Sequence, residues 1–240
     1  MNFRYTMLGA AGGLFFFYLG LLLSLLYFAG GTGFWEALTH PHTLFSIRVS
    51  LLAATLATFF AVAIGLPAAY ALSRFEFRGK RLLDTFLEVP MIISPIALGA
   101  ALLVFEIPGI VLAQFATIAG LATRLMKASL DEISPRYEAV ARSLGSTPWR
   151  AFYRITLPLA SRGLIASVIL SWAKAVGEFG ATVTLAGAMP GKTETMPIAI
   201  FLALASANID KAIVLILLLA VLGLATLYGA RLTGKRHRYD

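Results

Sequence analysis

Long apolar runs recur along this 240-residue sequence, and each is about as long as a helix that crosses a membrane. A helix needs roughly 20 apolar residues to cross the hydrocarbon of a bilayer. Hydrophobic residues make up 59% of the chain and charged residues only 13%, a charged share well below that of soluble domains. We therefore predict an all-α polytopic membrane protein, a single transmembrane domain over residues 1–240, with about six spans near 8–29, 46–73, 84–105, 109–127, 162–187 and 209–230.

Some of these runs allow another interpretation. Gln114 interrupts the run at 109–127, and only residues 106–109 separate it from the run before. The third and fourth runs alternatively form one re-entrant or broken pair. The first run follows Arg4 as a signal peptide would, but no clear small-x-small cleavage site precedes residues 30–34, so we predict a retained span.

Basic residues lie between the apolar runs and are not gathered in one patch with aromatic residues, as they are in nucleic-acid binders. Cytoplasmic connections of membrane proteins carry the excess of Lys and Arg. Here the basic segments are those before the first run and after the second, fourth and sixth runs. The net charge of +8 therefore indicates topology, with both termini in the cytoplasm.

Three prolines lie within predicted spans: Pro67 in the second, and Pro90 and Pro95 in the third. Proline removes a backbone donor and bends a helix, which membranes tolerate where neighbouring groups satisfy the freed carbonyl. We predict kinks at these positions, which are either ordinary packing kinks or parts of a gate.

The segment at about 128–160 is too polar to span a membrane, yet its pattern is regular. Ser134 is placed to cap a helix whose first residue is Pro135, and Gly145 to end that helix in a left-handed conformation. One apolar stripe follows helical spacing in this helix and consists of Tyr137, Val140, Ala141 and Leu144.

A second short amphipathic helix is predicted from Pro148, capped by Ser146 or Thr147 and closed by Leu157-Pro158 before the next span. Two such helices outside the membrane favour contact with another protein. The alternative is that both lie in the lipid interface, which basic residues beside aromatic residues also favour.

Residues 137–145, nine further residues, and then Ile155-Thr156-Leu157-Pro158 resemble the EAA loop of binding-protein-dependent ABC permeases. The family pattern is EAA, three residues, Gly, nine residues and I-x-L-P. Counting back from Gly145 places Ala139 at the position of the family's glutamate, and Glu138 is one residue early. The resemblance implies that this loop docks in a cleft of an ATPase subunit through Tyr137, Glu138, Ala139, Val140, Ala141, Leu144, Gly145, Ile155, Leu157 and Pro158.

The same resemblance implies the rest of the assembly. The chain is expected in the cell inner membrane as a homodimer surrounded by lipid, with an ATPase subunit and a soluble substrate-binding protein as partners and no nucleic acid. It contains no Gly-x-x-x-x-Gly-Lys-Ser/Thr loop. ATP and Mg are therefore expected on the ATPase, and no cofactor on this chain.

Two stretches resemble the molybdate and tungstate permeases: G-E-F-G-A-T at 177–182 and P-G-K-T-E-T-M-P at 190–197. Sulfate permeases more often have Tyr and Ser in the first stretch. The link at 106–109 is shorter than the external connection of these relatives. The resemblance implies import of molybdate or tungstate, and sulfate or another anion is the alternative. Hydroxyls and cations that suit an oxyanion occur nearby: Ser171, Lys174, Thr182, Thr184, Lys192, Thr193 and Thr195.

Two opposite charges, Lys174 and Glu178, lie within the fifth predicted span. Each costs roughly 2.5 to 3.5 kcal/mol at the bilayer centre, so exposure to lipid is unfavourable. At a spacing of four residues they share a helix face. They either pair with each other and stabilise the helix, or Lys174 lines the path of an oxyanion.

Other classes of function have less support. The chain has no Cys, and its three His residues lack metal-ligand spacing, so no metal site is predicted. An intramembrane enzyme needs paired acids, His clusters or an activated nucleophile, and Glu178 beside Lys174 is the one candidate. A stand-alone secondary transporter is expected to show inverted repeats, and none is visible.

Overall fold

The computed structural model describes residues 3–28, 34–100 and 106–234, and over these residues it contains helices and connecting segments but no strand. In chain order the elements are α1 (Phe3–Phe28), α2 (Phe34–Thr39), α3 (Pro41–Arg74), α4 (Lys80–Ile92), α5 (Pro95–Ala100), α6 (Ile107–Asp131), α7 (Arg136–Ser143), α8 (Pro148–Ala151), the π-helical turn η1 (Phe152–Thr156), α9 (Leu157–Val176), α10 (Gly180–Ala186), α11 (Met196–Ala205) and α12 (Ile209–Gly234). Within this part of the chain, five helical segments are long and apolar enough to cross a membrane: Tyr5–Ser24, Pro41–Arg74, Ile107–Asp131, Pro148–Val176 and Ile209–Leu232. The prediction of an all-α polytopic membrane protein is confirmed.

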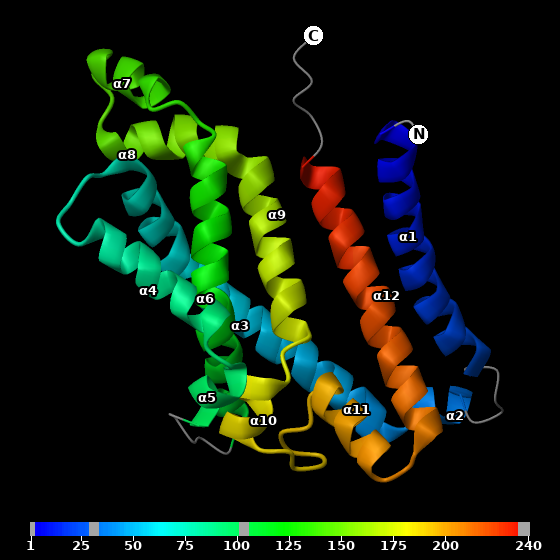
Figure 1. Cartoon of the computed structure of the whole chain (residues 1–240). Coiled ribbons are helices and arrows are strands. Elements are labelled where there is room, and N and C mark those ends of the chain that lie inside the picture. The colour runs from blue at the N-terminus through cyan, green and yellow to red at the C-terminus, as the bar shows by residue number, and fades with distance from the viewer. Residues whose placement is uncertain (1–2, 29–33, 101–105, 235–240) are drawn as a thin grey trace.

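Helices α3, α6, α9 and α12 pack in sequence across the bundle, each against the next (Figure 1). The contact between α3 and α6 depends on small side chains, because Ala54, Ala57 and Ala61 repeat along one face of α3 and are fully buried. Ile118 and Ala122 of α6 belong to the same buried cluster. Small residues let two helix backbones approach closely inside a membrane.

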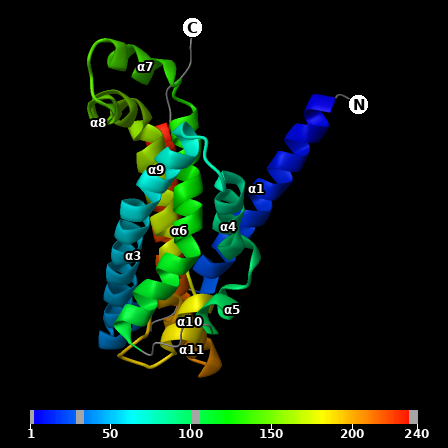
Figure 2. The ribbon, with the colours of Figure 1, turned by 90° about the vertical axis from the view of Figure 1, so that its left-hand side faces the viewer.

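Helix α1 is the exception, since none of its membrane-length segment is buried within the chain. It contacts α12 and diverges from the other helices, as Figure 2 shows.

The third predicted span, 84–105, is wrong as a continuous helix. Helix α4 ends at Ile92, Ile93 is extended, and α5 begins at Pro95. Proline disfavours a helical conformation in the residue before it, which explains the break. The fourth run is a full helix by itself, α6, so of the third and fourth runs only the third is broken. Residues 101–105 lie outside the described residues.

The other two prolines do not interrupt their helices. Pro67 lies inside α3 and Pro90 inside α4. Helix α4 packs closely on α6 one turn before Pro90, as shown by the lack of room for a Cβ on Gly120, which would collide with the carbonyl of Leu87.

The fifth predicted span, 162–187, is also interrupted. Helix α9 ends at Val176, Gly177 to Phe179 form a bend, and α10 is a separate helix of seven residues. Glycines at 177 and 180 weaken the helix there, which explains the end of α9. Helix α11 was not predicted, because its 10 residues are too few for a span.

The two ends of the bundle differ in what they carry (Figure 1). The start of α1, the end of α12 and the pair α7 and α8 lie at one end, which we call the α7 end. Helices α5, α10 and α11 lie at the opposite end, the α11 end. Both described termini therefore lie at the same end as the polar segment that follows α6.

Candidate functional site

The turn after α7 has the geometry that the sequence predicted. Gly145 has φ of +86°, its N–H donates to the Arg142 carbonyl at 3.0 Å, and the Ser146 N–H donates to the Ala141 carbonyl at 3.0 Å. These two bonds form a Schellman motif, which needs a left-handed residue at this position. The helix starts one residue later than predicted, and the Ser134 hydroxyl accepts from the Arg136 N–H at 3.4 Å.

The second helix of this segment starts as predicted, with the Thr147 hydroxyl accepting from the Arg150 N–H at 3.3 Å. The prediction that Leu157-Pro158 closes it is wrong, because α8, η1 and α9 are continuous. In η1 the Leu157 N–H donates five residues back, to Phe152. A π-helical turn moves the carbonyls that a regular helix would set against the ring of Pro158, so the helix continues through the proline. Figure 1 shows α8 lying across the end of the bundle while α9 runs along it.

The apolar stripe predicted on α7 is divided between two environments. Tyr137, Val140 and Leu144 are 56%, 61% and 82% exposed, and we call these three residues the docking stripe. Ala141 is buried at 8% exposure and faces the rest of the chain. An exposed apolar stripe on a short helix is typical of a surface that another protein covers.

Glu138, expected from the resemblance among the docking residues, connects α7 to the rest of the bundle. Its Oε2 accepts from the Tyr70 hydroxyl at 2.8 Å, and its Oε1 accepts from Arg74 Nε at 3.1 Å and from the Thr156 hydroxyl at 2.5 Å. Arg74 Nη2 also donates to the carbonyls of Leu130 and Ile133, at 3.1 and 2.8 Å. The Glu138 carboxylate therefore holds α7 to the end of α3 and to η1, and Arg74 extends the network to the end of α6.

The charge of Glu138 is stabilised by these donors. Burial raises the pKa of Glu138, but hydrogen bonds from Thr156, Tyr70 and Arg74 and the charge of Arg74 outweigh burial and hold the pKa below its ordinary value. The carboxylate is therefore ionised at neutral pH and forms an ion pair with Arg74.

The remaining motif residues differ in how far they are buried. Leu157 packs against the main buried cluster, Ile155 is half-buried and Pro158 is exposed. Ala139, at the position of the family's glutamate, is exposed on α7. The carboxylate that the pattern expects at position 139 is thus supplied one residue earlier, and it points toward α3.

Lys174 and Glu178 form an ion pair, with Lys174 Nζ 2.7 Å from Glu178 Oε2. Glu178 Oε1 also accepts from the Ala181 N–H at 3.2 Å, so the same carboxylate holds the start of α10. The Glu178 side chain is 2% exposed, whereas that of Lys174 is 49% exposed. The pairing is present, and Lys174 still presents half of its surface outside the chain.

Four of the hydroxyls expected to suit an oxyanion are buried within the chain, namely those of Ser171, Thr182, Thr193 and Thr195. The Thr193 hydroxyl is buried, accepts from the Met189 N–H and donates to the Gly187 carbonyl, at 3.1 and 3.2 Å. Thr195 is fully buried. The loop 187–195 is a compact structure held by its own bonds, and of its expected donors only Lys192 is exposed.

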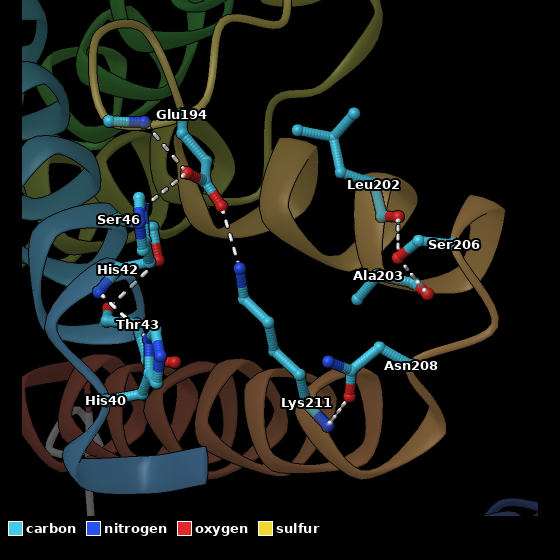
Figure 3. A network of polar contacts seen from close by, with 11 residues as sticks. His40, His42, Thr43, Ser46, Glu194, Leu202, Ala203, Ser206, Asn208 and Lys211 are labelled. Atoms are coloured by element: carbon cyan, nitrogen blue, oxygen red, sulfur yellow. Dashed lines mark hydrogen bonds and ion pairs between the residues drawn. The ribbon is translucent and has the colours of Figure 1, made fainter.

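A polar network at the α11 end was not found from the sequence (Figure 3). Glu194 is 1% exposed; it accepts from Lys211 Nζ and from the Gly191 N–H, both at 3.0 Å, and lies 3.8 Å from His42 Nδ1. These residues are far apart in the chain, so their proximity depends on the packing of α3 and α12 around the loop. In the sequence, the signal for this network was a glutamate placed between Thr193 and Thr195, and its burial became visible only in the structure.

The described residues were also compared with the requirements of a metal site. Among the described residues there is no group of three or more His, Asp or Glu side chains that could hold an ion. The rings of His40 and His42 stack on each other with centroids 5.6 Å apart.

Comparison with known proteins shows which family this chain is related to. Residues 61–239 match the family described as "Binding-protein-dependent transport system inner membrane component". The sulfate transport system permease protein CysT of Escherichia coli (strain K12) is 31% identical over 84% of this chain and 83% of its own length. The molybdenum transport system permease protein ModB of the same strain is 34% identical over 65% of this chain and 77% of its own.

The fold has been seen before at low sequence identity. A chain in the crystal structure of a bacterial alginate ABC transporter, in complex with an alginate pentasaccharide-bound periplasmic protein, is similar with a TM-score of 0.75. The two chains are 20% identical, over 97% of this chain and 94% of the other.

Proposed function

This chain belongs to the binding-protein-dependent transport system inner membrane component family, as the permease subunit of an ABC importer, and we propose that it translocates a tetrahedral oxyanion, molybdate or tungstate. Relatives for sulfate and for molybdenum are similar to it to nearly the same degree. One kind of relative is named for sulfate, which is a tetrahedral oxyanion, and the other for molybdenum, and these names support the class of substrate. The choice within the class rests on the two stretches at 177–182 and 190–197.

The observation that carries a role in coupling is the docking stripe on α7. Its three apolar side chains are exposed, while Glu138 holds the other side of the same helix to α3 and η1. A force on the stripe therefore reaches α9 through the continuous helix from α8, and α3 through Arg74. We propose that a separate ATPase subunit, with ATP and Mg, binds this stripe and that two copies of this chain form the permease.

Localisation follows the same reasoning. The family is a membrane component, and the α7 end carries both described termini and the docking stripe. We propose that the α7 end is cytoplasmic and that a soluble substrate-binding protein approaches the α11 end.

Uptake in proteoliposomes tests the substrate. The complex of this chain with its ATPase and binding protein is reconstituted, and import of labelled molybdate, tungstate and sulfate is measured with and without ATP. We expect ATP-dependent molybdate or tungstate uptake that sulfate inhibits weakly. Sulfate uptake that excess molybdate and tungstate fail to inhibit contradicts the choice of substrate and leaves the importer assignment in place.

A further inference from the structure

A groove of about 930 Å³ lies between the second half of α3 and the segment from α7 to η1. Its volume is within the range of sites that bind small molecules. The docking stripe does not line it, since the walls come from other side chains of α7 and from Trp149 and Tyr153. The groove is thus separate from the surface proposed for the ATPase.

One wall of the groove extends into the membrane-spanning part of α3. It reaches from Arg74 at the end of the helix to Leu66 and Val62. Twelve residues of helix span about 18 Å at 1.5 Å per residue. The hydrocarbon of a bilayer is about 30 Å thick, so the groove is about as deep as one leaflet.

The other end of the groove is polar, and its charged lining residues are Arg74, Glu138 and Arg142. Arg142 lines it, is exposed, and its guanidinium forms no hydrogen bond or ion pair within the part of the chain that the structure describes. Arg74 differs, because Glu138 and two carbonyls occupy its donors. Trp149 and Tyr153 are 71% and 57% exposed and stack with ring centroids 5.9 Å apart. Exposed aromatic rings beside an arginine are typical of the headgroup level of a membrane.

We propose that this groove binds a phospholipid with an anionic headgroup. An acyl chain lies along α3 between Leu66 and Val62, and the phosphate pairs with Arg142 beside Trp149. A protein segment is the less suitable occupant, because at the depth of Val62 its backbone groups would have no water to bond. A phospholipid matches the groove along its length, because its acyl chain is apolar like the end at Val62 and its headgroup is charged like the end at Arg142.

Photo-crosslinking tests the site in the full-length chain. The protein is placed in phosphatidylcholine nanodiscs with a phosphatidylglycerol that carries a diazirine in one acyl chain, and labelled peptides are mapped by mass spectrometry. We expect labelling concentrated on residues 62–71, the part of α3 that lines the deep side of the groove, with unlabelled phosphatidylglycerol competing better than phosphatidylcholine. Uniform labelling of the exposed helix faces, α1 included, would overturn the proposal.

Matched variants separate the site from general lipid contact. Arg142→Gln should lower this labelling about fivefold, as expected for loss of one cation beside an anionic lipid, and Arg142→Lys should retain most of it. Ala63→Trp should abolish it by filling the deep end of the groove. The controls are Arg150→Gln and Leu52→Trp, which change an arginine and an exposed α3 residue outside the groove. Equal labelling of the Arg142→Gln and Arg150→Gln variants would contradict the proposal.

The assembled complex provides the last measurement. Labelling that persists when the ATPase is bound agrees with a lipid in the groove. Labelling that the ATPase removes shows that a protein surface fills the groove, and this outcome also contradicts the proposal. Neither result depends on which oxyanion is transported, so the proposal of a lipid site and the proposal of the substrate are tested independently.

Discussion

The two ends of the bundle each contain a carboxylate that holds several segments together, but the two carboxylates lie in different surroundings. At the α11 end the Glu194 side chain is 1% exposed and connects a loop to α12 and α3. At the α7 end the Glu138 side chain is 14% exposed and connects an outlying helix to α3 and η1. The first closes the bundle, and the second holds a surface that remains open to a partner. A bonded carboxylate thus stabilises the packing at the α11 end, whereas at the α7 end it holds an exposed helix in position for a partner.

Removing the Glu194 carboxylate should have the largest effect. Glu194→Ala leaves Lys211, only 20% exposed at its side chain, without its partner. Loss of one member of a buried pair costs about 3–5 kcal/mol. We expect low protein levels and a strongly reduced thermal midpoint in detergent, with Glu36→Ala, an exposed acid at the same end, as the control. A midpoint equal to that of the control variant would show that the network does not stabilise the α11 end.

Removing the Glu138 carboxylate should affect coupling more than insertion. Glu138→Ala removes hydrogen bonds from Tyr70, Arg74 and Thr156, and because these bonds hold an outlying helix, their loss should act mainly on α7 and less on the rest of the bundle. We expect faster hydrogen exchange in α7 and weaker association with the ATPase at a nearly normal protein level. Glu132→Ala is the exposed control. Unchanged exchange in α7 would contradict the role given to Glu138.

A double-mutant cycle on Lys174 and Glu178 compares a third carboxylate with these two. Each single change to Ala should lower protein level or activity more than the double change, with a coupling energy of about 1–3 kcal/mol, because a single change leaves one charge unpaired. Simple addition of the two effects means that the residues do not interact. Loss of uptake in Lys174→Ala at a normal protein level favours the oxyanion path instead.

The bend at Gly145 should show a smaller effect. A Cβ there meets no atom within 4 Å, so the cost of substitution comes from the left-handed backbone alone, about 1–2 kcal/mol. Gly145→Val should weaken ATPase association or uncouple hydrolysis from transport without preventing insertion. Gly145→Asn, which tolerates this conformation, should be close to the original. Normal uptake and substrate-stimulated hydrolysis in Gly145→Val would refute the prediction.

Acid should affect the α7 end least over the usual range of pH. The pKa of Glu138 is lowered from 4.5 in the folded state, so its contribution is complete above about pH 4.5 and is lost as the pH falls through the folded value. The measurement is amide hydrogen exchange in α7, corrected for the intrinsic dependence of the exchange rate on pH. We expect the corrected rate to be constant from pH 7 to about pH 5 and to rise below about pH 4.5. In Glu138→Ala this step should be absent. A step at higher pH would point to another group.

Much of the α7 end could be predicted because its signals are local. Thr147, Pro148 and Gly145 set caps and a left-handed turn through their own backbone preferences, and the structure has these features where the spacing placed them. The inward orientation of Ala141 was not predictable from the stripe alone, since helical spacing gives a face but not its environment. The motif placed Glu138 among the docking residues, and only the structure shows that its carboxylate is bonded to α3 and η1.

The sequence by itself determined that the chain is helical and crosses a membrane, because runs of about 20 apolar residues match the length of a helix that satisfies its own backbone hydrogen bonds in lipid. It also determined the turn at Gly145. Prolines and glycines marked places where a helix could break, but only the tertiary structure decided that the third and fifth runs break while α3 continues through Pro67, that α8 continues into α9, and that Glu194 meets Lys211. These outcomes depend on which donors and charges neighbouring helices bring to a proline, a glycine or a buried carboxylate, and that information is not contained in any single run of residues.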